Sequence, residues 1–167
     1  MSKIGERDVF GHGGGYPGHI TRTLVDGERR LVVSVLTNAI DGPASQLAEG
    51  LLRLIDLAES KDRADDAGLA RFTGRFANLW GVVDIVLLGG RLYATDPAGP
   101  NPADEPQPLE ADGDNLRVTG GNDGAYGELY RFTFDADGAV ETIRGAHGLR
   151  LFPIEDFTLP ERVTVAR

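Results

Sequence analysis

The sequence of 167 residues contains no cysteine. Disulfide bonds, a thiolate nucleophile and a cysteine-ligated metal are therefore excluded, although this absence does not choose a cellular compartment. Basic residues are also scarce: 17 Lys and Arg stand against 26 Asp and Glu, which gives a formal net charge of -9. Because there is also no run of Lys or Arg, this charge argues against nucleic acid as the main partner.

Long apolar runs are missing as well. The first ten residues, MSKIGERDVF, lack the apolar region of a signal peptide, and no stretch approaches the length of a membrane-spanning helix. We therefore expect a soluble chain, cytoplasmic as given, with no membrane partner.

The metal-binding residue types do not gather into a recognisable site. Three histidines, far apart and without cysteine, make a poor zinc site. The acidic residues of the predicted turns lack the spacing of an EF-hand and suit local turn hydrogen bonding; they are Asp112, Asp114, Asp123, Asp135 and Asp137. We expect no metal and no cofactor.

The first unit, placed at residues 1–62, predicts strands followed by a helix. Residues 19–25 and 31–38 flank a turn at residues 26–28, and the second of these segments is a nearly continuous apolar run. Such a run is typical of a strand covered on both faces. From Pro43 to Ser60 the polar residues recur at helical spacing. They leave an apolar side made of Leu47, Leu51, Leu54, Ile55 and Ala58.

A charged stretch at residues 60–68 separates this unit from a second one at residues 68–157, with a tail at residues 158–167. The second unit contains extended segments divided by turn signals, among them Gly89-Gly90 and residues 112–115 and 135–138. Roughly eight such strands, with no helix between them, predict a mainly β fold with a closed antiparallel barrel.

The barrel interior is expected to be solid or nearly so, because large apolar side chains alternate along its strands. The residues expected to point inward are Phe72, Phe76, Ile85, Leu87, Leu92, Val118, Phe132 and Leu151. We predict that Trp80 and Tyr93 belong to the ordinary core rather than to a ligand cavity.

The glycine-rich segment VFGHGGGYPGH, residues 9–19, is the most unusual feature of the chain. Gly13-x-Gly15-x-x-Gly18 matches the dinucleotide-binding fingerprint, but a strand-like segment follows where the motif needs a helix. HGGG also occurs in the oxyanion hole of α/β-hydrolase esterases, which need a Gly-x-Ser-x-Gly elbow. None of the serines lies in such an elbow; these are Ser2, Ser34, Ser45 and Ser60. Both interpretations are disfavoured.

A third interpretation uses more of the sequence. His12-Gly13-Gly14, the strand end Leu36-Thr37-Asn38 and the helix at residues 43–60 occur in this order. The pattern resembles the last catalytic motif of the serine β-lactamase and penicillin-binding-protein superfamily, in particular its esterase and D-amino-acid-peptidase branch. The second unit, opening at residues 71–94, resembles the lipocalin-like barrel that enzymes of this branch often carry.

This resemblance implies a serine hydrolase that cleaves amides or esters through an acyl-enzyme. It implies that His12 faces the substrate carboxylate or assists proton transfer, that Gly13 and Gly14 allow close approach of substrate, and that the Gly15 N–H donates to the oxyanion. The Ser-x-x-Lys nucleophile motif is missing, so the chain resembles the C-terminal segment of such an enzyme. We expect it to be inactive alone and to need an upstream catalytic domain.

The alternative is a non-enzymatic lipocalin-like barrel that binds a small ligand or mediates assembly. A few strands and one helix cannot bury both faces of a sheet, and an open edge invites pairing. We therefore predict a homodimer, with the partial sheet packed on its own barrel or on a second copy of the chain. His19 and His147 are predicted to be surface or hydrogen-bonded residues without a functional role.

Overall fold

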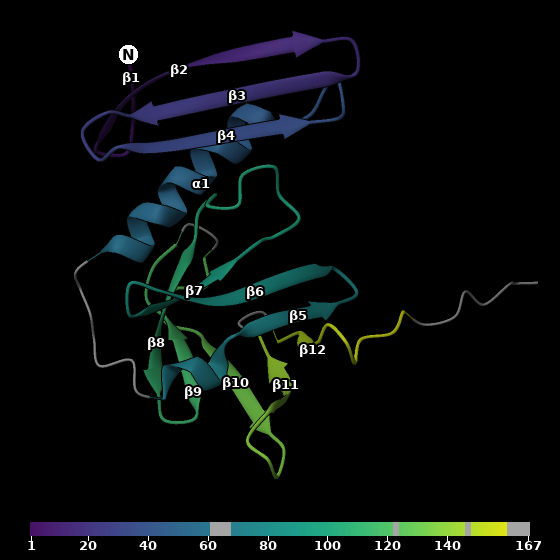
Figure 1. Cartoon of the computed structure of the whole chain (residues 1–167). Coiled ribbons are helices and arrows are strands. Elements are labelled where there is room, and N and C mark those ends of the chain that lie inside the picture. Colours follow the sequence, from purple (N-terminus) through teal and green to yellow (C-terminus); the bar gives the residue numbers. More distant parts are fainter. Residues whose placement is uncertain (61–67, 122–123, 146–147, 160–167) are drawn as a thin grey trace, which may run out of the picture.

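The computed structural model describes residues 1–60, 68–121, 124–145 and 148–159. It is mainly β: a four-stranded antiparallel sheet and one helix precede a closed, eight-stranded antiparallel barrel (Figure 1). The predicted fold class is confirmed. Most of the predicted linker, most of the predicted tail, Asp123 and His147 lie outside the described residues.

The sheet consists of β1 (Ser2–Ile4), β2 (Arg7–Tyr16), β3 (His19–Asp26) and β4 (Leu31–Thr37), in that spatial order. Strand β1 was not predicted from the sequence, and it pairs only with the first three residues of β2, Arg7–Val9. Strands β2, β3 and β4 pair along their lengths, so that Gly13 lies opposite Arg22 and Leu24 opposite Val33.

Helix α1 (Ala44–Glu59) covers one face of this sheet. Small and branched apolar side chains form the contact between helix and sheet. Ala48 and Leu52 of the helix are fully buried against Val9, Leu24 and Val33 of the sheet. The predicted helix face was partly wrong, because Leu51 is 39% exposed and Ala58 is exposed. Apolar residues occur around much of this helix, and alanine lets it approach the sheet most closely.

The barrel begins after a 3₁₀ helix, η1 (Leu69–Phe72), which replaces the extended segment predicted for Phe72. Its strands are β5 (Gly74–Asn78), β6 (Gly81–Leu88), β7 (Arg91–Thr95), β8 (Gln107–Asp112), β9 (Asn115–Val118), β10 (Leu129–Phe134), β11 (Val140–Arg144) and β12 (Arg150–Pro153). Pairing of β12 with β5 closes the ring. The predicted two-residue turn joins β6 and β7, where Gly89 and Gly90 have φ values of 57° and 82°.

The barrel core contains the predicted inward residues. Phe72, Ile85 and Leu92 are 1% exposed, while Leu87 and Phe132 are partly buried against the same cluster. The prediction for Trp80 was wrong: its side chain is 83% exposed, because it lies in the β5–β6 turn rather than on a strand. Tyr93 is buried, but outside that core cluster.

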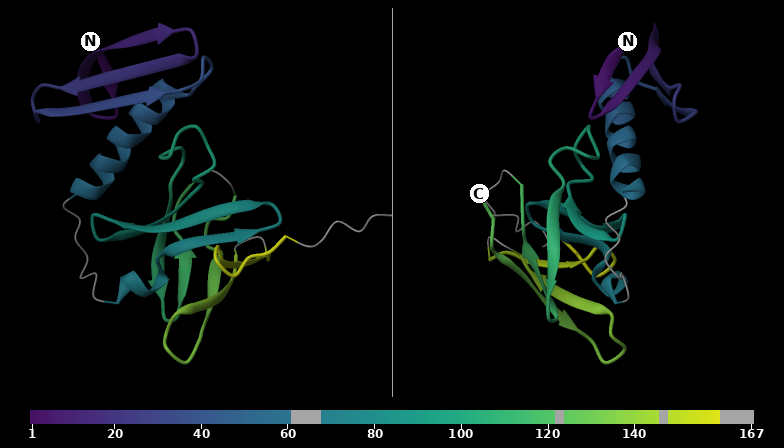
Figure 2. Two further views of the ribbon diagram at one scale, coloured as in Figure 1. Left: turned by 45° about the vertical axis from the view of Figure 1, so that its right-hand side comes forward. Right: turned by 90° about the vertical axis from the view of Figure 1, so that its left-hand side faces the viewer.

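Helix α1 lies between the sheet and the barrel (Figure 2). Two glycines permit this close contact: a side chain at Gly50 would overlap Asn101 and Pro102, and one at Gly89 would overlap the Leu57 carbonyl. The helix is therefore the main contact between the sheet and the barrel, and the other face of the sheet points away from the barrel. No helix in the described part of the chain has the length and apolar character needed to cross a membrane.

Candidate functional site

The predicted site residues His12, Gly13, Gly14 and Gly15 lie in the second half of β2. Alternation along the strand places His12 and Gly14 on the face away from α1, because Val9 points into the core beneath the helix. His12 is exposed and lies opposite Thr23, on the same face as Ser34. The Thr23 and Ser34 hydroxyls share a hydrogen bond of 2.8 Å.

A different glycine carries the strictest steric requirement. A side chain at Gly11 would overlap the Thr23 carbonyl, whereas a Cβ at Gly13 or Gly15 would meet its nearest neighbour at 3.4 Å. Gly11 therefore allows β2 and β3 to approach each other. Sequence reasoning included Gly11 in the glycine-rich segment but gave it no role, because nothing local distinguishes it from its neighbours.

Two edges of the sheet are open within the part of the chain that the structure describes. Beyond Val9, residues 10–16 of β2 pair only with β3, and β4 pairs only with β3. Each open edge presents unpaired backbone N–H and C=O groups, which is the usual template for adding another strand.

The face opposite α1 carries apolar side chains with nothing over them in the described residues. Phe10, Val25 and Val32 lie opposite one another across three strands, and Leu36 follows on β4. Phe10 is 52% exposed, Val32 59% and Leu36 76%. The prediction that the apolar run of residues 31–38 is covered on both faces is therefore wrong for this single chain: α1 covers Val33, while Val32 and Leu36 face outward.

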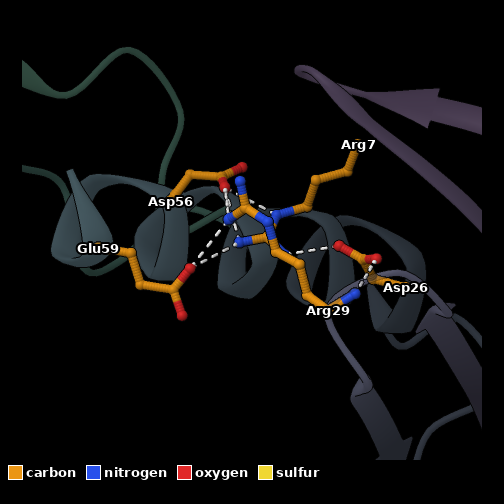
Figure 3. A network of polar contacts seen from close by, with 5 residues as sticks. All are labelled: Arg7, Asp26, Arg29, Asp56 and Glu59. Carbon is orange, nitrogen blue, oxygen red and sulfur yellow. Dashed lines mark hydrogen bonds and ion pairs between the residues drawn. The ribbon is translucent and has the colours of Figure 1, made fainter. Parts of the chain in front are cut away.

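A buried ion network fastens the sheet to the helix (Figure 3). Arg7 is 4% exposed, and its guanidinium contacts Asp26 at 2.8 Å and Asp56 of α1 at 2.6 Å. Glu59 lies 3.4 Å from Arg7, and Arg29 joins the same carboxylate at 2.9 Å. Sequence reasoning missed this cluster because its members are as many as 52 residues apart.

The network favours the ionised forms of Arg7 and Asp26. The hydrogen bond to Asp56 raises the pKa of Arg7 against the opposing effect of burial, with Asp26 adding to it. The backbone N–H of Arg29 lowers the pKa of Asp26, and the hydrogen bond from Arg7 acts in the same direction. With every member in an ion pair, the cluster is a structural clamp between sheet and helix rather than a reactive centre.

No family model matches the sequence, and the search of curated proteins finds no match. The fold is similar to two solved structures of SurE, one of them with D-Leu, each at 20% sequence identity and a TM-score of 0.42. The match covers 87% of this chain and 35% and 34% of the SurE chains, so this chain spans about a third of their length. At this TM-score the similarity carries no argument about function.

These comparisons give no support to the assignment to the serine β-lactamase and penicillin-binding-protein superfamily, which therefore does not stand. The similar structures are named SurE, neither is named as a β-lactamase or a penicillin-binding protein, and no model of that superfamily matches. The pattern His12-Gly13-Gly14 is too short to identify a superfamily, and the close approach of β2 to β3 depends on Gly11 rather than on these glycines. The superfamily assignment and the hydrolase function are therefore not carried further, and the upstream catalytic domain stays an untested prediction.

Proposed function

We propose that the N-terminal unit is an association module and that the chain forms a homodimer through β4. The observation that carries this proposal is that β4, an uncharged and apolar strand, lies at an open edge of the sheet. Its sequence, LVVSVLT, has no charge, yet it forms an open edge with Val32 and Leu36 exposed. Isolated edges are normally protected by charged residues, proline or a covering segment, and a long, apolar edge recruits another strand.

The geometry of β4 suits pairing with a second copy of itself. Strand β4 spans seven residues, so an antiparallel pairing about a two-fold axis is centred on Ser34. This register places Val32 opposite the partner's Leu36, twice per dimer and on the same face. Each of these cross-strand apolar pairs contributes roughly 0.2–1 kcal/mol, in addition to the burial of surface.

Charge supports the same antiparallel arrangement. Arg30 stands exposed just before β4, and Asp41 stands exposed four residues beyond its end. In the antiparallel register centred on Ser34, Arg30 lies opposite the partner's Asn38, at the end of the strand that leads to Asp41. A parallel arrangement would bring like charges together.

Strand β4 is a better pairing edge than β2. Glycine is poorly suited to strands, and residues 10–16 of β2 contain Gly11, Gly13, Gly14 and Gly15. Valine and leucine in β4 suit a pleated, half-buried surface. Pro17 also ends β2, so a partner strand there would lose a backbone donor at that end.

Sedimentation velocity of the purified chain over a range of concentrations tests the proposal. The parent chain is expected to dimerise, and Leu36→Asp to raise the dimer dissociation constant by up to about 30-fold, because two apolar pairs of at most roughly 1 kcal/mol each are lost per dimer. Leu79→Asp is the matched control, since Leu79 is 67% exposed in the β5–β6 turn. A parent chain that stays monomeric, or a Leu36→Asp variant that dimerises as tightly as Leu79→Asp, contradicts the proposal.

A further inference from the structure

The two ends of the barrel differ in how they are closed. Because neighbouring strands are antiparallel throughout, alternate connections fall at opposite ends. One end has the short turns β6–β7, β8–β9 and β10–β11 and is plugged by η1. There the Phe72 ring, 1% exposed, lies 5.0 Å from that of Phe132, and Arg71 bonds Asp114 of the β8–β9 turn at 2.8 Å.

The other end holds the β5–β6, β7–β8, β9–β10 and β11–β12 connections, and it is hollow. A cavity of about 380 Å³ opens there. A smaller hollow of about 180 Å³ adjoins it, and the two share Val83, Asp96 and Tyr130. We call this region the barrel mouth. The larger cavity falls within the range of roughly 300–1,000 Å³ that small-molecule sites occupy.

Apolar and aromatic side chains form most of the wall of the larger cavity. Leu151 is 3% exposed and Tyr130 is 8% exposed, so both belong to the barrel core and form a fixed floor. Trp80 and Leu149, 83% and 42% exposed, stand at the rim. A flat aromatic ring left in water beside an apolar cavity is the arrangement that a ligand with an apolar body would cover.

The described charged residues that line the mouth are all acidic. Asp96 lines both hollows, Asp104 and Glu105 line the smaller one, and no described lysine or arginine lines either. Asp96 is exposed, and one of its carboxylate oxygens accepts the Ala98 N–H at 2.8 Å, which orients the side chain. The Asp96 carboxylate at this position attracts a positively charged group and repels an anion.

We propose that the barrel mouth binds a small amphiphilic cation, an alkylammonium or arylalkylammonium compound. Its apolar body lies between Trp80, Leu149 and Leu151, and its ammonium group meets the Asp96 carboxylate. The exposed face of the indole adds a cation–π contact for a positive group at the rim. The cavity volume fits a single small molecule.

Trp80 is the only tryptophan of the chain, so its fluorescence reports on this cavity alone. We propose titrating the full chain at pH 7 with hexylamine, 1-hexanol and hexanoate, which share one alkyl chain and differ in charge. Calorimetry on the same three compounds supplies a readout that does not depend on Trp80. Hexylamine is protonated at this pH, as a lysine side chain is with its pKa of about 10.4.

Hexylamine is expected to change the Trp80 emission saturably with one molecule bound per chain. Hexanol is expected to bind about fivefold more weakly, since an exposed ion pair contributes up to roughly 1 kcal/mol, and hexanoate more weakly still. Asp96→Asn should remove the preference for the amine over the alcohol. Asp137→Asn, the same change in the β10–β11 turn at the plugged end, should keep that preference.

Two further variants separate this site from the sheet. Leu149→Arg places a cation in the wall of the mouth and should abolish amine binding, while Leu36→Asp on β4 should leave it unchanged. The proposal is overturned if no compound gives saturable fluorescence or heat, if hexanoate binds as tightly as hexylamine, or if Asp96→Asn retains the full preference for the amine. Because the readout is ligand binding and not oligomeric state, its failure leaves the proposed association through β4 standing.

Discussion

The sheet and the barrel differ in how their strand edges and apolar faces are covered. Every barrel strand has two neighbours, because β12 pairs with β5 and closes the ring, and the inward side chains fill the interior. Within the described residues the sheet has two open edges, and α1 covers only one of its faces. A closed barrel thus pairs all of its strands internally, whereas this four-stranded sheet with one helix leaves apolar surface and strand edges available for pairing.

The largest expected effect is a cavity in the barrel core. Ile143 is fully buried on β11, and Ile143→Ala should lower the free energy of unfolding by about 4 kcal/mol, because a void replaces packed methyl groups. Urea unfolding followed by far-ultraviolet circular dichroism measures this. The loss should not depend on protein concentration, since the barrel needs no partner. Ile154→Ala, at a position 40% exposed, is the control and should cost less than about 1 kcal/mol.

Next in size is the loss of the clamp between sheet and helix. Arg7→Ala leaves Asp26 buried without its guanidinium partner, and removing one member of a buried pair costs about 3 kcal/mol. The damage should be confined to the N-terminal unit, with β1–β4 amides exchanging faster and barrel amides unchanged in hydrogen-exchange mass spectrometry. Arg29→Ala, which removes a half-exposed cation of the same network, should cost less than about 1 kcal/mol. Equal losses for the two variants would show that burial of Arg7 does not decide the effect.

A smaller effect is expected from acid. The pKa of Asp26 is lower in the folded chain than in the unfolded chain, so the unfolded state takes up the extra proton as the pH falls. The stabilisation is therefore complete above the ordinary aspartate pKa of about 3.9 and is lost progressively below it. Arg7 stays protonated throughout, because its raised pKa moves further from this range. Urea midpoints between pH 6 and pH 3 should fall less steeply for Asp26→Asn than for the parent chain, and equal slopes would exclude this role for Asp26.

Local chemistry explains which parts of the fold were predictable. Gly89-Gly90 predicts a hairpin, because a two-residue turn needs successive positive φ values that suit glycine. The alternation of apolar residues around Phe76 and Ile85 predicts strands with one side facing the barrel interior. The number of strands predicted a closed barrel, but the pairing of β12 with β5 that closes it joins residues far apart and has no local signal of its own.

The features that carry the proposals are tertiary and therefore escaped prediction. The run of residues 31–38 reads as a strand buried on both faces, and only its position at a sheet edge reveals that one face is open. Trp80 was expected in the core, but its place in a turn puts it at the rim of a cavity. Arg7 finds its partner Asp56 across 49 residues of sequence. The sequence shows that these apolar side chains favour burial, but only the three-dimensional fold shows which of them remain exposed.

The most direct test of the central claim is hydrogen exchange at β4, compared between a dilute and a concentrated solution of the same chain. If β4 pairs with a second copy, the amides of Leu31–Thr37 should gain protection as the concentration rises, while those of β5 to β12 stay constant. Leu36→Asp should remove the gain. Exchange at β4 that is the same at both concentrations would contradict association through this edge.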